Sequence, residues 1–401
     1  MTASLTARPD AIRRHNLALI LGHVHRDGEL TRAELTQRLG VSRSTIGALV
    51  ADLIELGLVD ESVPSGGDRV GRPSHVVGPH PEGPFVVAVD IDVTHIKSAA
   101  IGLGGLVLAR DRVPTGPDRI DPADVAESIA DAVERLSAGA RRASGPIGIG
   151  VSVPGTVDPR TGTVGVAPNL GWRRVALAKM IADRVTGRLP VTVGNDANLS
   201  VLAEFSRGNA RDCDDVVYLI GRVGVGAGII VNGAPLRGRD GRAGEIGHNV
   251  VDTAGPPCHC GKNGCLETYI GDVALLTLAR RQVPPSDEQT ESVLAAARAG
   301  DAVALSAVRT VAESVGRALG SLANTLNPQR VILGGSLSGV LDIARDHMQQ
   351  ALAQYTFDAT GSPIELFRPR FGADSAMLGA AELAFAELLE DPLGGRVLLP
   401  R

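Results

Sequence analysis

One short segment limits the possible folds of this 401-residue chain more than any other, because it concentrates metal-binding side chains. Cys258, Cys260 and Cys265 lie within eight residues, and His248 stands ten residues before the first of them. Three thiolates and an imidazole form the closed tetrahedral set that structural zinc prefers, and glycines between the cysteines let the backbone curl around an ion. The alternative is three packed cysteines in a loop, but loops of small residues seldom concentrate thiols without a metal. The segment therefore predicts one structural zinc ion.

Length and composition predict a cytoplasmic protein of two or three domains. The chain is long for one domain and 44% apolar, so it can bury substantial cores. It has no run of 18 or more apolar residues, and its N-terminus lacks the apolar core of a signal peptide, so we expect no membrane association. The net charge of -5 argues against a protein surface that is basic throughout and binds nucleic acid nonspecifically, but it leaves local basic patches possible.

The first sixty residues predict three short helices, each of which stops at a glycine. Thr31 with Glu34 is a capping box, and Ser42 can cap the third helix, so both of these helix starts are also marked chemically. Only a few residues separate the second helix from the third, which is the spacing of a helix-turn-helix. The expected helices span residues 11–28, 31–40 and 41–57.

A wing is expected after the third helix. Residues 58–61 predict a short strand, and the Gly- and Pro-rich sequence after it predicts a hairpin that carries Arg69 and Arg72. These two arginines suit phosphate or minor-groove contacts. Residues 79–84 then read as an extended, proline-stiffened linker.

In a helix-turn-helix the start of the second helix of the motif meets base edges in the major groove. Here that position offers Arg43, Ser44 and Thr45, with Ala48 as a flat methyl contact and Arg43 as the best reader of guanine. One such head has a short footprint, so we expect a homodimer or homotetramer that binds an inverted repeat in operator DNA.

From residue 85 the pattern changes to α/β, and one strand plan occurs twice. Each copy is a three-stranded meander followed later by a buried strand, which predicts a duplicated, two-lobed body with a ligand cleft between the lobes, as in actin-like kinases. In the first copy the expected strands are 85–91, 95–103, 105–113 and 146–153, with a helix at 121–140 before the last of them. In the second copy the expected strands are 215–220, 226–233, 234–238 and 330–335.

Several stretches resemble the repressor/open-reading-frame/kinase (ROK) family across residues 11–389. They are Glu245-Ile246-Gly247-His248, the segment from Cys258 to Glu267, SVPGTVD at 152–158, PNLGW at 168–172 and GNDAN at 194–198. The resemblance implies a winged helix-turn-helix followed by an α/β, two-lobed, actin-like and ribonuclease H-like body. We accordingly expect a DNA-binding domain with linker at 1–82 and a sugar-binding body at 83–401. Its small lobe would span about 84–195 plus a C-terminal helix at about 375–390, and its large lobe about 196–374.

The resemblance also implies a sugar site and the zinc ligands. His248 and the three cysteines would bind zinc, and carboxylates with carboxamides would satisfy the donors and acceptors of a hexose ring. The residues placed around the sugar are Asn169, Asn195, Asp196, Glu245, His248 and Glu267. In family kinases Asp196 would be the general base.

Both phosphate-holding turns of the kinases are altered in this chain. The kinases' Asp-x-Gly-Gly-Thr-Lys is replaced by Asp90-Ile91-Asp92-Val93-Thr94-His95, and their Gly-Thr-Gly by Arg222-Val223-Gly224. Glycines that let backbone amides approach phosphate are lost and Asp92 adds negative charge, although Arg222 could attract an anion. Phosphoryl transfer depends on positioning and charge stabilisation, so we expect no catalysis, a vestigial base at Asp196, and no ATP. Gly334-Gly335 still resembles part of a nucleotide site, or it ends a buried strand.

These features predict a sugar-responsive, DNA-binding transcriptional regulator, most simply a repressor, with a structural zinc. One alternative is an ATP-dependent sugar kinase with an added DNA-binding head, which turnover with ATP would reveal. Another is a constitutive DNA-binding protein whose body is only a dimer scaffold, which the absence of any sugar-induced thermal shift would favour.

Overall fold

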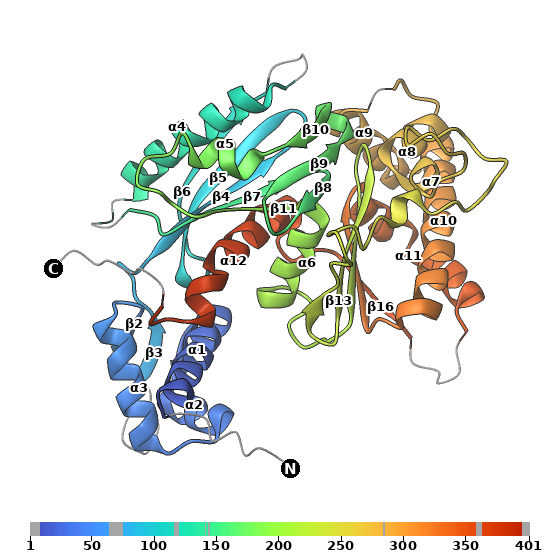
Figure 1. Ribbon diagram of the computed structural model, residues 1–401. Coiled ribbons are helices and arrows are strands. Elements are labelled where there is room, and N and C mark those ends of the chain that lie inside the picture. The colour runs from blue at the N-terminus through green and yellow to red at the C-terminus, as the bar shows by residue number, and fades with distance from the viewer. Residues whose placement is uncertain are drawn as a thin grey trace, which may run out of the picture.

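The computed structural model describes residues 9–63, 75–115, 120–140, 142, 145–283, 285–357 and 363–394. It consists of a small N-terminal head and a two-lobed body (Figure 1). Among the described residues, no helix combines the length and the apolar character that crossing a membrane requires.

The head contains the three predicted helices, α1 (Pro9–Asp27), α2 (Arg32–Leu39) and α3 (Arg43–Glu55). Thr31 and Glu34 form both halves of the predicted capping box, and the Ser42 side chain accepts a hydrogen bond from the Thr45 amide. A small sheet in the order β1-β3-β2 completes the head, with the predicted strand after α3 as one edge. Its strands are β1 (Leu30–Thr31), β2 (Val59–Ser62) and β3 (Val76–Pro79). The predicted wing tip, with Arg69 and Arg72, lies outside the described residues.

The first lobe is built on a five-stranded sheet in the order β11-β7-β4-β5-β6. Strands β4, β5 and β6 form the predicted antiparallel meander, and β7 runs parallel to β4 and β11. Helices α4 and α5 pack on one face and α12 on the other. The bounds are β4 (Phe85–Ile91), β5 (His95–Gly102), η1 (Leu103–Gly105), β6 (Val107–Pro114), α4 (Pro122–Ala140), β7 (Ile149–Val153), α5 (Leu177–Ala182), β11 (Val191–Asn195) and α12 (Ser375–Glu390). A separate small sheet contains β8 (Thr156–Asp158), β9 (Thr163–Ala167) and β10 (Trp172–Val175), with η2 (Pro168–Leu170) between the last two.

The second lobe repeats this strand order as β16-β15-β12-β13-β14, which confirms the predicted duplication. Helix α6 packs on one face of its sheet, and the long helices α10 and α11 pack on the other. The bounds are α6 (Asp196–Arg207), β12 (Val216–Gly221), β13 (Val225–Val231), β14 (Ala234–Pro235), η3 (Ile246–His248), α7 (Glu267–Ile270), α8 (Asp272–Leu278), α9 (Asp287–Arg298), α10 (Ala302–Leu326), β15 (Arg330–Gly335), α11 (Ser336–Tyr355), β16 (Glu365–Phe367) and η4 (Gly372–Asp374).

Helices α6 and α12 lie against each other between the two sheets (Figure 1). Their backbones are in close contact, because a Cβ atom at Gly379 would collide with the carbonyl oxygen of Leu199. Packing this tight leaves little room for one helix to slide on the other, so we treat the two as one unit.

The head is joined to the body by packing as well as by the chain. Residues 79–84, predicted to be an extended linker, are instead a strand end followed by a turn in which the Gly83 amide donates to the His80 carbonyl. Helix α1 contacts α12, η1 and α6, and one apolar cluster runs from the head into the body. Prolines restrict φ without preventing a turn, and the prediction missed the apolar surface that α1 offers to the body. Among the buried members of that cluster are Leu17, Ile20, Leu21, Leu103, Phe385 and Leu388.

Candidate functional site

A cleft between the lobes brings together all six residues that the resemblance implies as sugar contacts. Asn169 comes from η2, Asn195 and Asp196 from the junction of β11 and α6, Glu245 and His248 from the η3 loop, and Glu267 from the start of α7. All of them line the same cleft, together with Asp90, Asp92, Arg222 and the start of α12 at Ala376.

Asn195 and Asp196 are held by the start of α6. The Asn195 Oδ1 atom caps the helix by accepting from the Asn198 amide at 3.0 Å, and its Nδ2 atom donates to the Gly155 carbonyl at 3.1 Å and to Asp196 Oδ1 at 2.9 Å. Burial raises the pKa of Asp196 to about 6, with Arg222 opposing the shift. The carboxyl that would be a kinase's base therefore has a fixed orientation and a raised pKa.

Glu267 is fixed by partners on three sides, and one of these was not identified from the sequence. Its Oε2 atom accepts from the Val225 amide at 3.1 Å, and its Oε1 atom lies 2.9 Å from His259 Nδ1 and 3.7 Å from Cys258 Sγ. His259 lines the cleft with its ring centroid 5.4 Å from that of His248. The sequence did offer a signal for His259, because it lies between Cys258 and Cys260. When its two neighbours face a metal ion, the middle residue of a tight loop can face the opposite side, which here is the cleft.

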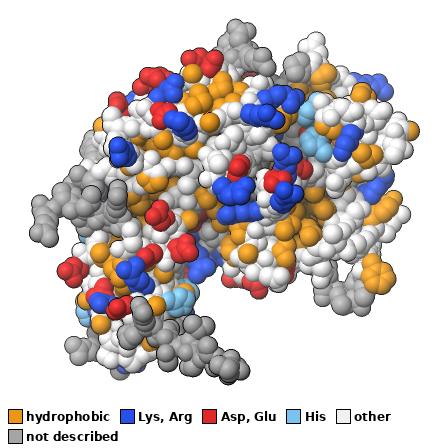
Figure 2. Space-filling model, in the orientation of Figure 1, with side chains coloured by type: hydrophobic (Ala, Val, Ile, Leu, Met, Phe, Trp, Pro, Cys, Tyr) orange, Lys and Arg blue, Asp and Glu red, His pale blue; other side chains and the backbone are white. Residues whose placement is uncertain are grey.

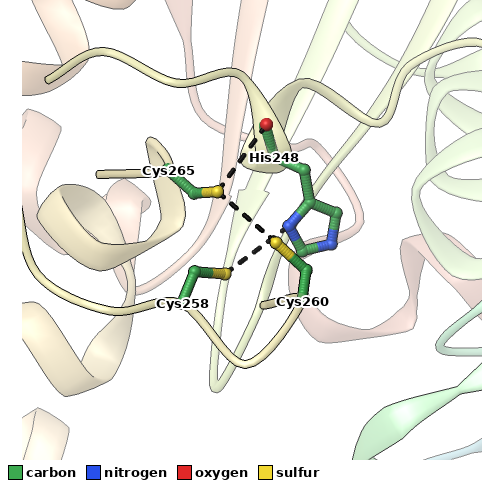
Figure 3. Close-up of side chains that lie close together, drawn as sticks. All are labelled: His248, Cys258, Cys260 and Cys265. Atoms are coloured by element: carbon green, nitrogen blue, oxygen red, sulfur yellow. Dashed lines mark hydrogen bonds between the residues drawn. The ribbon is translucent and has the colours of Figure 1, made fainter. Parts of the chain in front are cut away.

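The predicted metal ligands converge around one point (Figure 3). A ring nitrogen of His248 and the sulfurs of Cys258, Cys260 and Cys265 all lie within 4.8 Å of one another. The Cys260 and Cys265 sulfurs are 3.6 Å apart, and Cys258 Sγ is 3.8 Å from His248 Nδ1. Zinc–sulfur bonds of about 2.3 Å in a tetrahedron place two sulfurs about 3.8 Å apart, so the donor set fits zinc.

The two glycines of the metal loop have the conformations that its tight turns require. Gly261 has a φ of 90° and Gly264 a φ of 68°, both in the left-handed region. A side chain at Gly264 would also collide with the Asp252 carbonyl oxygen, so the loop closes only with glycine there.

The two altered phosphate turns face each other and are tied by an ion pair. Asp92 follows β4 in the first lobe, and its carboxylate accepts a hydrogen bond from the guanidinium of Arg222, which follows β12 in the second. Burial opposes the charge on Arg222, but Asp92, Asp90 and Asp196 outweigh it and raise the Arg222 pKa. The arginine that could have attracted an anion is therefore already paired with a carboxylate.

Gly334 and Gly335 end strand β15, which was the simpler of the two sequence-based interpretations. A side chain at Gly335 would collide with the carbonyl oxygen of Gly221 on β12, and the Ser336 hydroxyl donates to that same carbonyl at 3.2 Å. Close packing between the two strands is thus sufficient to explain glycine at position 335.

The predicted DNA-reading residues lie on the solvent side of the start of α3. Arg43, Ser44, Thr45 and Ala48 are all exposed, and Ser44 and Thr45 each place a hydroxyl 2.8 Å from the Ser42 hydroxyl. Within the described part of the chain, no hydrogen bond or ion pair involves the Arg43 side chain.

Other arginines of the head are paired with acids, as in Arg13–Asp52, Arg32–Glu61 and Arg38–Asp27. On the face of the head seen in Figure 2, acidic and basic side chains are interspersed. Arg43 is thus available for an external partner, whereas these other arginines are held by neighbouring carboxylates.

Comparisons with known proteins extend over both parts of the chain. Residues 86–387 match the ROK family, and residues 18–69 match the MarR family. A glucokinase from Halalkalibacterium halodurans is 34% identical over 75% of this chain and 94% of its own length. A xylose repressor from Caldicellulosiruptor bescii is 26% identical over 95% of this chain and 98% of its own.

A solved structure described as a ROK family transcriptional regulator, homolog of E. coli MLC protein, has a TM-score of 0.78. It is 27% identical to this chain, covering 96% of it and 98% of the solved chain. The similarity includes the head as well as the body. The winged helix-turn-helix head, the duplicated two-lobed body and these matches together show that the chain belongs to the ROK family.

Proposed function

We propose that this protein is a sugar-responsive transcriptional repressor whose head, residues 1–82, binds operator DNA and whose body, residues 83–401, binds a hexose or related sugar. The observation that carries the proposal is that α6 and α12 both run from the cleft to the head. Asp196 and Ala376, near the starts of the two helices, line the cleft, while both helices contact α1 farther along. Full-length similarity to a xylose repressor supports the same function.

Sugar recognition is assigned to the six cleft residues, with zinc as a structural support. Carboxylates and carboxamides accept from and donate to sugar hydroxyls, and an analogue that lacks a hydroxyl leaves one of these groups unpaired. When bound, zinc would fix the loop that carries His248 and His259. Because Nδ1 of His248 faces the cysteines, its Nε2 atom is the one left to reach a ligand.

We assign the transmission of the signal from the cleft to the head to a buried cluster of three charged or ionisable side chains. Arg207, at the end of α6, lies 2.6 Å from Glu382 Oε1 on α12, and Glu382 Oε2 lies 3.0 Å from His25 Nε2 on α1. The Gly104 amide donates to His25 Nδ1 at 3.1 Å, so both ring nitrogens of His25 have partners, one in η1 and one on α12. A sugar that closes the cleft would shift α6 and α12 together and reorient the head, provided that it binds the closed state more tightly.

A kinase with an added head is the second candidate, favoured by Asp196 in its expected place and by similarity to a glucokinase. The ion pair between Asp92 and Arg222 weighs against it, because it joins the two turns at which a kinase would hold phosphate. We therefore propose that the protein does not turn over ATP. We also propose that two or four copies bind an inverted repeat.

Operator affinity measured with and without a panel of sugars tests the proposal, alongside sugar phosphate formed from ATP in the same samples. We expect one sugar to change operator affinity several-fold without formation of its phosphate. Turnover at enzymic rates would establish the kinase instead. Operator binding that no sugar alters, together with the absence of a sugar-induced thermal shift, would leave a constitutive DNA-binding protein.

A further inference from the structure

The cleft that would bind the sugar is strongly acidic. Seven carboxyl groups line it, whereas Arg222 is the one guanidinium among its described residues and His248 and His259 are its two imidazoles. The acids are Asp90, Asp92, Asp196, Glu245, Glu267, Asp272 and Asp287. Burial raises the pKa of Asp196 and of Asp272 to about 6, and it also raises the pKa of Asp90 and of Glu245. This reduces the negative charge of the cleft, but its seven carboxyl groups still face a single guanidinium.

The single arginine of the cleft offers little to an anion. Its guanidinium is paired with Asp92, and its positive charge is shared with Asp90 and Asp196. A phosphate on the sugar hydroxyl next to Asp196 would have to separate Arg222 from Asp92 and then lie beside the carboxylate of Asp92 and the buried carboxyl groups of Asp90 and Asp196. Like charges at such short range repel strongly in a partly buried site.

Four backbone amides in and beside the two turns already donate to acceptors within the protein. In the first turn the Asp92 amide donates to the His95 carbonyl at 2.9 Å, and the Val93 amide donates to the Asp92 side chain. In the second turn the Arg222 amide donates to the Gly224 carbonyl at 2.8 Å, and the Val225 amide donates to Glu267 at 3.1 Å. An anion-binding turn needs free amides that point at the ligand, and these four already have acceptors.

We infer that the effector of this cleft is an unphosphorylated sugar, and that the Asp92–Arg222 pair and the acids around it exclude the phosphorylated form. This inference rests on the proposed function and adds the chemical class of the effector. The cleft selects the form of the sugar that exists before any kinase has acted on it.

Calorimetric titration of the full-length protein with matched pairs tests this. The probes are glucose, mannose and N-acetylglucosamine, each with its 6-phosphate. We expect at least one free sugar to bind and its phosphate to bind at least tenfold more weakly. Equal or tighter binding of the phosphate would overturn the inference while leaving sugar sensing intact. If no member of any pair binds, the proposed function itself fails, and the inference fails with it.

A variant identifies the cause of the selectivity. Asp92→Asn removes the charge that holds Arg222, so the ratio of phosphate affinity to free-sugar affinity should rise at least tenfold. Asp342→Asn is the matched control, because Asp342 pairs with Arg368 at 2.9 Å and neither residue lines the cleft. The ratio should stay as in the wild type for this control. A ratio that is also unchanged in the Asp92 variant would show that the ion pair does not exclude phosphate.

Discussion

His25 of the head and Glu382 of the body form a buried contact, with Nε2 of the imidazole 3.0 Å from Oε2 of the carboxylate. Both side chains are almost completely buried, and Arg207 lies on the other oxygen of the carboxylate at 2.6 Å. Burial would raise the pKa of Glu382, but His25 and Arg207 outweigh it and lower that pKa to about 2. A carboxylate thus remains charged inside the junction between the DNA-binding part and the ligand-binding part.

Glu382→Gln should weaken both folding and signalling. The substitution keeps the shape of the side chain but leaves the Arg207 charge buried and unpaired, which typically costs about 3 kcal/mol or more. We expect urea unfolding to show this loss in the free energy of unfolding. We also expect a weaker sugar response, in which the ratio of operator affinities with and without sugar moves towards one. Asp391→Asn is the control, because its pair with Arg14 also joins body and head but is exposed, so it should change stability by less than about 1 kcal/mol.

The acid dependence of stability gives a second measurement on the same variant. The Glu382 pKa is lowered on folding from 4.5 to about 2, so its contribution is complete above pH 4.5 and is lost as the pH falls towards 2. The free energies of unfolding of the wild type and of Glu382→Gln, measured as a function of pH, should therefore differ most above pH 4.5 and converge below it. A difference in free energy of unfolding that stays constant across this pH range would mean that the charge of Glu382 does not stabilise the contact between head and body.

Cys258→Ser should remove the metal and destabilise the cleft. We expect elemental analysis of the purified wild type to give one zinc per chain and the variant to give much less, because three ligands do not close the tetrahedral set. Cys213→Ala is the control, since Cys213 is buried outside the cluster and should leave the zinc content unchanged. A folded wild-type protein without zinc would contradict the metal assignment.

Arg43→Ala should weaken operator binding by roughly 1–3 kcal/mol and alter the base preference, as expected for a guanine contact in the major groove. Arg72→Ala should weaken binding more evenly across sequences, because the wing is assigned to phosphate or minor-groove contacts. Footprinting and titration at fixed salt compare the two variants. Unchanged affinity and preference in the Arg43 variant would place base recognition elsewhere on the head.

Sugar binding and DNA binding should separate by mutation. Glu245→Ala leaves a sugar hydroxyl unpaired without removing a metal ligand, so sugar affinity should fall while sugar-free operator binding persists. Asp196→Asn keeps the shape but removes any general base, so part of the sugar response should remain. The measurements are operator affinity with and without sugar and sugar phosphate formed from ATP. Enzymic turnover in the wild type that the Asn variant abolishes would show that the altered turns still hold phosphate.

Features that depend on neighbouring residues could be predicted from the sequence. The capping box of Thr31 and the cap at Ser42 locate the helices of the head, and the spacing of three cysteines locates the metal loop. The duplicated strand order was predicted from two copies of one strand plan in the sequence. The convergence of six cleft residues from separate segments was predicted only through the resemblance to a family.

Contacts between distant segments could not be predicted in this way. Asp92 and Arg222 are 130 residues apart, and His25 and Glu382 are 357 apart. Local periodicity carries no information on such pairs, because they depend on how the lobes and the head are packed. The same holds for residues 79–84, whose prolines indicated a linker although the parts on either side share a core.

The apolar cluster that runs from α1 into α12 and η1 determines how this protein can be divided or recombined. Separating the head from the body in the turn after β3 would expose to water the apolar surface at which α1 meets α12 and η1, and we expect a fragment made this way to aggregate. A head transplanted onto the body of another family member would meet an unmatched surface. We therefore expect an exchange of heads between relatives to succeed only when the residues of η1, α6 and α12 that contact α1 are transferred with the head.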